Sequence, residues 1–224
     1  YRRFGILGCG YVSDSYLLTL ANHPSISLVG CHDLDPARAE KFAAFAGIQN
    51  YRSLSDMLAE SSLDAVINLT NPRSHFETTQ ACLEAGKHVY SEKPLGMSVA
   101  EAQELLGIAK QMGVVLATAP CSVLSPSAQT LEQAIRDGVI GRVRLVYANF
   151  DDGMIAPFKH PWNWKNSLGV LWPAKDEFEV GCTFEHAGYF LSWLCSFFGS
   201  AHSVNSYAGC LIPDKGIRVD GMAP

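Results

Sequence analysis

The sequence predicts an α/β fold whose first half is a doubly wound parallel sheet, followed by the start of an α+β domain. Two observations lead to this fold class. Short apolar runs rich in β-branched residues alternate with longer amphipathic stretches over residues 4–120, and this alternation is typical of parallel strands joined by crossover helices. The 224 residues are 48% hydrophobic and only 17% charged, so the chain can bury a substantial core or two modest ones.

The elements of the first half follow from local signals. Ser98 suits the start of a helix because Glu101 follows three residues later, and Gly47 suits a helix end. Strands are therefore predicted at Phe4–Leu7, Ile26–His32, Ala65–Thr70, His88–Ser91 and Val114–Thr118. Helices are predicted at Val12–Asn22, Pro36–Ala46, Leu54–Glu60, Phe76–Ala85 and Val99–Met112.

After Pro120 the pattern changes, so we expect a first domain over residues 1–120 and a second domain over residues 121–224. One strand, a long loop and two helices do not make a sheet with both faces covered. We therefore expect the second part to be the start of a C-terminal α+β domain for substrate binding and oligomerisation, truncated in this sequence. The elements predicted there are a helix at Ser127–Asp137, a strand at Val143–Phe150, an aromatic and proline-rich stretch at Asp151–Glu179 and an apolar helix at Thr183–Phe198.

The composition argues against several classes of function. A net charge of -5 without clustered Lys and Arg gives no reason to expect nucleic acid, and no apolar run approaches the ~20 residues of a membrane span. The seven cysteines are scattered and never lie at zinc-ligand spacing, so we expect no metal site, buried thiols and a reducing, cytoplasmic location. The chain opens at Tyr1 rather than Met, which leaves room for a removed targeting segment.

A glycine-rich turn, G-C-G-Y-V-S, follows the first predicted strand and opens the first predicted helix. Its first glycine permits a tight turn, its second lets the backbone approach a pyrophosphate, and the helix N-terminus offers unpaired N–H groups to the anion. A serine stands where a third glycine is usual, and it is small enough for close packing. The alternative is an ordinary glycine turn, but the context predicts a Rossmann dinucleotide-binding domain. Its cofactor contacts are predicted at Gly8, Gly10, Tyr11, Val12 and Ser13.

An acidic residue ends the second predicted strand. Asp33 lies 23 residues beyond Gly10, where a carboxylate can accept hydrogen bonds from the hydroxyls of the adenosine ribose. The same charge would repel a 2′-phosphate, so NAD is predicted rather than NADP. Asp35 is a rival for this role, and both carboxylates could instead cap the helix that begins at Pro36.

Two further segments carry a resemblance to a known family. The segment A-G-K-H-V-Y-S-E-K-P-L-G, residues 85–96, resembles the signature of the Gfo/Idh/MocA oxidoreductases, the family of glucose-fructose oxidoreductase and inositol dehydrogenase. Upstream, T-N-P-R-S-H at residues 70–75 resembles the family's T-P-x-x-H segment with one inserted Asn. With the glycine turn, these motifs cover most of residues 4–120. The resemblance implies further cofactor contacts at Thr70, Asn71, Pro72, His75, Glu92 and Lys93.

The resemblance also implies the catalytic residues. In the family, the lysine of E-K-P lies beside the nicotinamide and the substrate, which assigns Lys93 to catalysis. Taken alone, Glu92 and Lys93 are equally compatible with solvated loop charges. Family members carry an acidic residue followed four positions later by His, and here the aligned residues are Glu185 and Tyr189. A tyrosine at that position resembles the sub-branch that contains dimeric dihydrodiol dehydrogenase.

Helix periodicity supports a role for this second segment. Glu185, Tyr189 and Ser192 recur at i, i+4 and i+7 on one helix face, whereas His186 lies on a more apolar stripe. We therefore interpret His186 as a packing residue. The alternative for Tyr189 is a core residue, because its phenol pKa near 10 opposes proton transfer at neutral pH. The ammonium of Lys93 would favour the phenolate.

These assignments predict hydride transfer between nicotinamide C4 and a secondary alcohol, whose proton passes to Tyr189 with help from Lys93. Glu185 would orient the reacting groups, and no metal is needed. The family implies a small-molecule sugar, cyclitol or polyol substrate, and the aromatic and polar stretch Phe158–Lys165 suits a sugar ring or, alternatively, an interface between copies of the chain. The expected partner is a second copy bound through the C-terminal domain. Other functions left open are an NAD-retaining glycosidase or lyase and a redox-inert NAD-binding protein.

Overall fold

The chain divides into two compact units in the computed structural model, which describes residues 2–150 and 162–209. The first unit combines Tyr1–Ala119 with Asn163–Val180, and the second combines Pro120–Trp162 with Gly181–Pro224. A segment from late in the chain is therefore part of the first unit. Of the aromatic stretch Phe158–Lys165, residues 158–161 lie outside the described residues.

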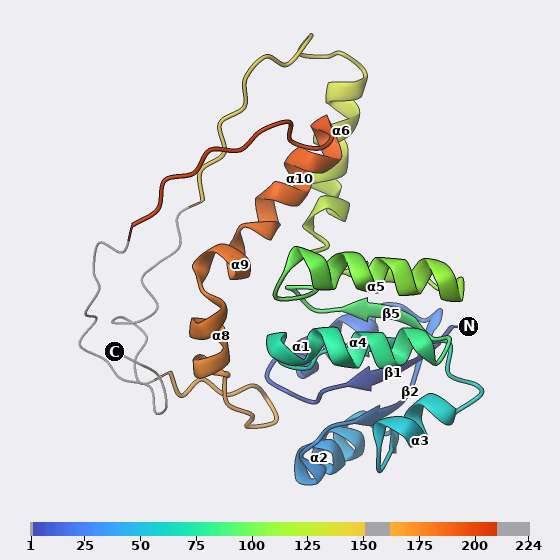
Figure 1. The fold of residues 1–224 in the computed structure, drawn as a ribbon. Coiled ribbons are helices and arrows are strands. Elements are labelled where there is room, and N and C mark those ends of the chain that lie inside the picture. Colours follow the sequence, from blue (N-terminus) through green and yellow to red (C-terminus); the bar gives the residue numbers. More distant parts are fainter. Residues whose placement is uncertain (1, 151–161, 210–224) are drawn as a thin grey trace. The chain divides into compact units, whose positions relative to one another are not determined.

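Six parallel strands form one sheet in the first unit (Figure 1). Their order is β3-β2-β1-β4-β5-β6, so the chain starts in the middle of the sheet and winds outward in both directions. The doubly wound prediction is confirmed, and the winding direction reverses between β1 and β4, the place where such sheets bind ligands. The strands are β1 Arg2–Leu7, β2 Ile26–His32, β3 Gln49–Asn50, β4 Ala65–Asn68, β5 His88–Ser91 and β6 Leu116–Thr118.

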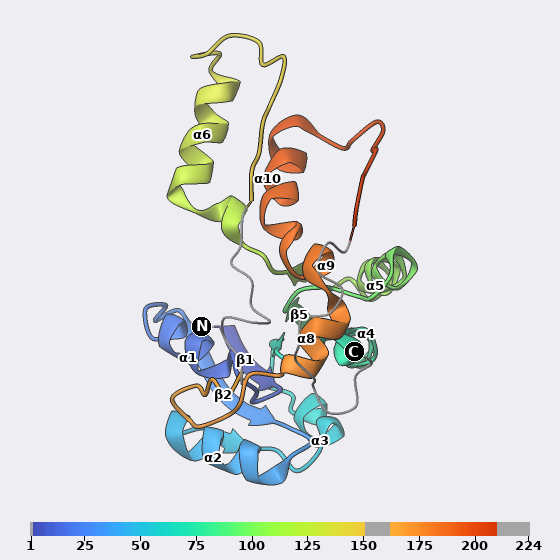
Figure 2. The same ribbon diagram turned by 90° about the vertical axis from the view of Figure 1, so that its left-hand side faces the viewer.

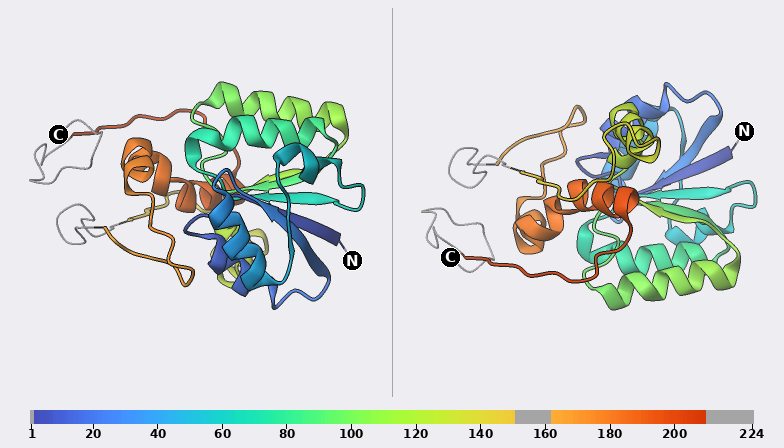
Figure 3. Two further views of the ribbon diagram at one scale, coloured as in Figure 1. Left: turned by 90° about the horizontal axis from the view of Figure 1, so that it is seen from below. Right: turned by 90° about the horizontal axis from the view of Figure 1, so that it is seen from above.

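Helices cover both faces of this sheet (Figure 3). On one face, Met57, Leu83 and Leu105 from α3, α4 and α5 are buried in one apolar cluster with strand residues. On the other face, Phe42 of α2 and Ile6 of β1 belong to a second cluster, against which α1 packs. Burial of both sheet faces explains the nearly continuous apolar character of the strands. The helices are α1 Ser13–Leu20, α2 Pro36–Ala46, α3 Leu54–Ala59, α4 His75–Glu84 and α5 Val99–Met112.

Caps determine where the two best-predicted helices begin and end. The side chain of Asp35 accepts two backbone N–H groups in the first turn of α2, and Gly47 ends the helix with φ of 67°. Ser98 caps α5, which ends at Gly113 with φ of 68°. Side-chain oxygens satisfy the free N–H groups of a first turn, and glycine tolerates the left-handed conformation of a helix end. Both helices therefore have the predicted bounds.

Two elements of the first unit were missed by the sequence patterns. The strand β3, Gln49–Asn50, has only two residues, both polar, so no apolar run marks it. The helix α8, Ala174–Val180, lies, except for its last residue, inside the stretch Asp151–Glu179 that was expected to be a loop. That expectation is wrong for α8, whose Ala, Lys and Glu residues favour helix and which follows a proline.

The second unit differs from the prediction at one strand and one helix. In the described structure, residues 143–150 are not a strand, and Leu145 and Tyr147 are 67% and 84% exposed. Residues that favour β-structure form a strand only where a neighbouring strand is available for hydrogen bonding. The helix expected at Thr183–Phe198 is split at Ala187, just before Gly188, a weak helix former. The helices are α6 Pro126–Arg136, α9 Cys182–His186 and α10 Gly188–Phe198. No helix in the described part of the chain has the length and apolar character needed to cross a membrane.

Candidate functional site

The glycine turn connects β1 to α1 at the point where the strand order reverses. Gly8 has φ of +90°, and a Cβ there would lie 2.7 Å from the backbone of Leu69. At Gly10, the nearest described atom to such a Cβ would be the Leu69 carbonyl oxygen, at 3.9 Å. The turn therefore requires glycine at Gly8, while Gly10 leaves the backbone open to the close approach of a ligand.

Ser13 closes this turn from inside the protein. Its side chain is fully buried, and its hydroxyl donates a hydrogen bond of 2.7 Å to the Gly10 carbonyl oxygen. Tyr11 and Val12 lie between these two residues, and Val12 is 36% exposed. The serine thus combines the close packing of a small residue with a bond that holds the turn together.

The two carboxylates after β2 have different partners. Asp35 caps α2, and the hydrogen bond from the Arg38 backbone is the main reason that the pKa of Asp35 is lowered. Asp33 accepts the N–H groups of Cys9 at 2.7 Å and of Asp35 at 2.8 Å. Its side chain is only 8% exposed, and Arg38 lies 3.8 Å away. Asp33 therefore joins the glycine turn to the end of β2.

A cavity of about 650 Å³ lies beside the glycine turn. Gly8, Gly10 and Asp33 line it, together with Thr70 and Asn71 from the loop after β4. These residues follow the carboxyl ends of three neighbouring strands, which is where open parallel sheets bind nucleotides. The volume is in the usual range of small-molecule sites, so this cavity is the candidate dinucleotide site.

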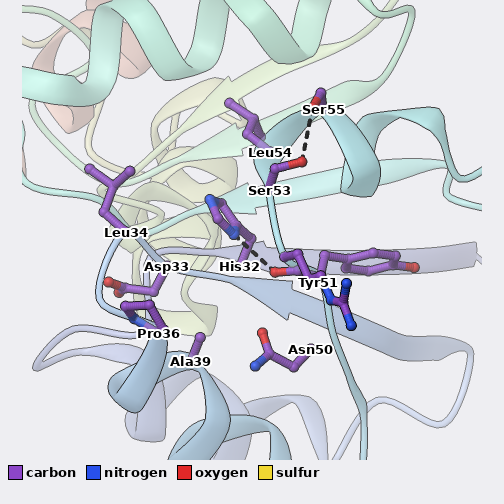
Figure 4. A pocket seen from close by; sticks show the side chains of 11 residues that line it. His32, Asp33, Leu34, Pro36, Ala39, Asn50, Tyr51, Ser53, Leu54 and Ser55 are labelled. Atoms are coloured by element: carbon purple, nitrogen blue, oxygen red, sulfur yellow. Dashed lines mark hydrogen bonds between the residues drawn. The ribbon is translucent and has the colours of Figure 1, made fainter.

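A second cavity of about 660 Å³ adjoins the first around Asp33 (Figure 4). Both cavities are lined by His32, Asp33, Leu34 and Leu54. A ring nitrogen of His32 lies 3.1 Å from the carbonyl oxygen of Tyr51, which holds the ring between β2 and the segment that leads into α3. Asp33 therefore lines both cavities.

Two buried polar residues organise the loop after β4. Asn68 is fully buried, accepts the Thr70 hydroxyl at 2.7 Å and donates to the Thr78 hydroxyl at 2.8 Å. The ring nitrogens of His75 lie 2.8 Å from the Thr70 carbonyl oxygen and 2.6 Å from that of Pro94. Burial lowers the pKa of His75, so the neutral ring donates to one of the two carbonyls. His75 therefore connects this loop to the E-K-P turn and, like buried Pro72 beside it, is not among the residues that line the cavity.

The E-K-P turn follows β5 and is held by a residue of α1. Glu92 accepts the Tyr16 hydroxyl at 2.5 Å through one carboxylate oxygen and the Lys93 N–H at 3.0 Å through the other. Burial and the charge of Glu92 raise the pKa of Tyr16, so its hydroxyl stays protonated and donates. Because α1 begins at the glycine turn, this contact connects the helix after the turn to the backbone of Lys93.

The predicted catalytic residues are divided between the units, with Lys93 in the first and Glu185 and Tyr189 in the second. Glu185 lies on α9, and Tyr189, which is 39% exposed, lies in the first turn of α10. The Tyr189 carbonyl oxygen accepts the Ser122 hydroxyl at 3.2 Å. The ring of His186 stacks on that of Phe150, with centroids 5.7 Å apart. The convergence of Lys93 and Tyr189 stays a prediction.

A late segment of the chain reaches the glycine turn and was missed by the sequence patterns. The side-chain amide of Asn166 donates to the carbonyl oxygens of Gly10 at 3.3 Å and Tyr11 at 3.1 Å. Ser167 donates to the carboxylate of Asp14. Asn166 and Tyr11 are 155 positions apart in the sequence, so no local motif can reveal the contact.

Residues 2–119 match the family model GFO_IDH_MocA, described as an oxidoreductase family with an NAD-binding Rossmann fold. The chain belongs to the Gfo/Idh/MocA oxidoreductase family. The match includes the whole sheet, the glycine turn and the E-K-P turn. The resemblance stated from the motifs is thus confirmed, and the matched family is one of NAD-binding Rossmann-fold oxidoreductases.

Individual Gfo/Idh/MocA relatives differ in cofactor and substrate. Trans-1,2-dihydrobenzene-1,2-diol dehydrogenase of Mus musculus is 30% identical over 167 residues, which are 72% of this chain and 50% of the relative. A structure of GenD2 from gentamicin A biosynthesis in complex with NAD is 25% identical, with a TM-score of 0.57 over 62% of this chain and 40% of that one. A 3-ketoreductase from Actinomadura kijaniata in complex with TDP-benzene and NADP is 26% identical, with a TM-score of 0.58 over 64% and 46%. The chain spans about half the length of the curated relatives it matches.

Proposed function

We propose that the chain carries the dinucleotide site of an NAD(H)-dependent dehydrogenase that acts on a secondary alcohol of a sugar, cyclitol or related polyol. The observation that carries the proposal is the cavity beside the glycine turn, with Asp33 at its ribose end. Relatives named as a diol dehydrogenase and as a 1,5-anhydro-D-fructose reductase support the substrate class.

The residues of the site fit a dinucleotide. The turn has no room for a side chain at Gly8, and Gly10 leaves its backbone accessible. The carboxylate of Asp33 suits ribose hydroxyls and opposes a 2′-phosphate, which favours NAD over NADP. When bound, the cofactor supplies the nicotinamide carbon that accepts or gives the hydride.

The remaining chemistry falls to three side chains that the family resemblance assigns. The Lys93 ammonium stabilises the negative charge that develops on the substrate oxygen. The Tyr189 hydroxyl exchanges the proton of that oxygen. An ammonium beside the phenol would lower the phenol pKa and so favour this proton transfer at neutral pH. Glu185 orients one of these groups or a substrate hydroxyl. Lys93 supplies the positive charge that a metal ion would otherwise provide.

Cofactor choice is tested by titrating the protein with NAD+ and NADP+ and following tryptophan fluorescence. We expect NAD+ to bind at least about tenfold more tightly, since a close like charge is worth more than 1.4 kcal/mol at low dielectric. The Asp33→Asn variant keeps an oxygen acceptor for the Cys9 N–H but removes the negative charge. The difference in affinity between NAD+ and NADP+ should therefore become smaller. A wild-type preference for NADP+ would overturn the assignment of Asp33.

The reaction is tested with a panel of sugars and cyclitols and the full-length protein, by following NADH formation. At least one polyol should be oxidised, and Lys93→Met should lower kcat by about 100-fold or more. A different result would support the NAD-retaining glycosidase or lyase. In that case NAD+ binds and no polyol gives net NADH, but glycosides or activated sugars are converted to product with only a catalytic amount of NAD+ present. Full activity of Lys93→Met would contradict the proposed chemistry.

We further propose that the protein self-associates through its C-terminal part. On α9 and α10, the apolar side chains of Phe184, Leu191 and Phe198 are 50%, 48% and 46% exposed in the described structure. Exposed apolar groups of this kind often mark association surfaces. Light scattering of the full-length protein should give a mass of at least a dimer, and a monomer at micromolar concentration would contradict this.

A further inference from the structure

We propose that residues 164–172, here called the strap, form a second component of the dinucleotide site, with Asn166 as a positioning residue for the pyrophosphate. The proposal rests on the proposed function, because it concerns the affinity of the same site. The strap belongs to the first unit, although it lies more than 150 positions from the turn it contacts. Figure 2 shows its orange trace beside α1, β2 and α2.

The strap is a closed turn that holds Asn166 in one orientation. The Asn166 N–H donates to the Val170 carbonyl oxygen at 3.0 Å. Its side-chain oxygen accepts the N–H groups of Leu168 at 3.0 Å and Val170 at 2.9 Å. The rings of Trp164 and Trp172 close the base of the turn, with centroids 4.7 Å apart. The Asn166 amide N–H groups are therefore preorganised to donate outward.

The strap is also anchored in the core of the first unit. Leu168 is 6% exposed and belongs to the apolar cluster of Ile6 and Phe42. The Lys41 ammonium donates a hydrogen bond of 2.5 Å to the Leu168 carbonyl oxygen. Burial and a charged hydrogen bond together hold the strap against α2 and the sheet.

The first effect of the strap is on the carbonyl groups of the glycine turn. A pyrophosphate is bound by N–H groups, and carbonyl oxygens that turned toward it would repel it. Asn166 donates to the carbonyl oxygens of Gly10 and Tyr11, and the Ser13 hydroxyl donates to Gly10 as well. These bonds hold both carbonyls in place, so the peptide units keep the orientation that directs their N–H groups to the anion.

The second effect is on a carboxylate near the anion site. Asp14 is the second residue of α1 and is only 8% exposed. The Ser167 N–H and hydroxyl both donate to one of its oxygens at 2.8 Å. A buried carboxylate beside a phosphate is unfavourable unless donors satisfy it. Ser167 of the strap supplies two such donors to Asp14.

The test compares three ligands that differ in what they place at the turn: NAD+, ADP-ribose and adenosine. Affinities are measured by calorimetric titration of the protein and its variants. For Asn166→Ala we expect binding of NAD+ and ADP-ribose to weaken about tenfold, as for the loss of about two hydrogen bonds. Binding of adenosine, which has no pyrophosphate, should change less than twofold. A role limited to stability would not separate the ligands in this way.

A second variant keeps the strap folded. Asn166→Asp retains the oxygen that accepts from Leu168 and Val170, but it cannot donate to the turn and brings a negative charge close to the anion. Its loss of NAD+ affinity should exceed that of Asn166→Ala and shrink at high salt. The matched control is Asn22→Ala, an exposed residue after the far end of α1, which should bind NAD+ within twofold of the wild type.

The outcomes separate this proposal from the proposed function. If the wild type binds neither NAD+ nor NADP+, the proposed function fails. If the wild type binds NAD+ and Asn166→Asp binds it equally well, only the role of the strap is overturned. An equal loss of affinity for adenosine and ADP-ribose in Asn166→Ala would also overturn it, because the strap would then affect the stability of the protein and not the binding of the pyrophosphate.

Discussion

Single residues around the glycine turn are constrained from several sides, and Gly8 most of all. Its backbone is left-handed and its N–H donates to the His32 carbonyl oxygen at 2.8 Å. In Gly8→Ala the new methyl group would meet the Leu69 backbone and strain φ. We expect the free energy of unfolding to fall by at least about 2 kcal/mol and NAD+ binding to be lost. Urea unfolding and NAD+ titration measure the two effects.

The matched control for Gly8→Ala is Gly107→Ala. Gly107 lies inside α5, and apart from its chain neighbours and the backbone of its own helix, a Cβ there would have no described atom within 4 Å. Because alanine favours helix over glycine, this change should stabilise the protein by about 0.5–1 kcal/mol. If both substitutions had the same effect, the close approach of Leu69 to Gly8 would not be the cause.

Tyr16 is the residue whose loss most directly tests the link between α1 and the E-K-P turn. Tyr16→Phe removes the hydroxyl that donates to Glu92 and leaves a partly buried carboxylate oxygen without this donor. We expect a loss of about 1–3 kcal/mol in the free energy of unfolding. In Tyr207→Phe, where the side chain is 100% exposed, the change should stay within about 0.5 kcal/mol. Equal stability of Tyr16→Phe and the wild type would show that the contact is not formed in solution.

At the level of elements, the sequence predicts best where a strand or helix carries its own signal. The predicted bounds are correct for the strands β2 and β5, which are marked by apolar runs, and for the helices α2 and α5, which are marked by caps. The two-residue strand β3 has no such signal. Residues 143–150 show the opposite case, since a strand-like composition is not sufficient without a partner strand.

The same limit applies to the site. The glycine turn, Asp33 and the E-K-P turn are local motifs, so they could be found in the sequence. The partners that hold them are far away in the chain: Tyr16 and Glu92 are 76 positions apart, and Ser167 and Asp14 are 153 positions apart. Such pairs depend on how the elements pack, which no short window of sequence contains.

The contact between α1 and the strap should depend on pH. Burial by itself raises the pKa of Asp14, but the hydrogen bonds from Ser167 outweigh it and lower the pKa below the usual value. Because the folded pKa is the lower one, the stabilisation is complete above the unfolded pKa of about 3.9 and is lost as the pH falls through the folded pKa. The difference in unfolding free energy between the wild type and Asp14→Asn, about 1–2 kcal/mol at pH 7, should shrink toward pH 3. The exposed Glu104→Gln on α5 serves as the control and should show no comparable difference at pH 7.

At the scale of the whole molecule, the first unit is assembled from two separate stretches of chain. Residues 163–180 belong to the first unit, although residues 120–162, which precede them in the sequence, belong to the second unit. If the strap strengthens NAD+ binding, NAD+ must strengthen the docking of the strap by the same free energy, because coupling between two binding events is reciprocal. A ligand bound in the first unit should therefore stabilise a segment that lies, in sequence, between the two stretches of the second unit.

Amide hydrogen exchange measured by mass spectrometry tests this coupling. With NAD+ at 100 times its Kd, we expect peptides covering residues 8–14 and 164–172 to exchange more slowly together, by up to about 100-fold where opening of the strap abolishes binding. The reason is that ligand binding adds RT ln(1 + [L]/Kd), about 2.7 kcal/mol, to the free energy of any opening that releases the ligand. Peptides from α5, which contributes no residue to the cavity, should change much less. Slower exchange at residues 8–14 with unchanged exchange at residues 164–172 would show that the glycine turn binds NAD+ without help from the strap.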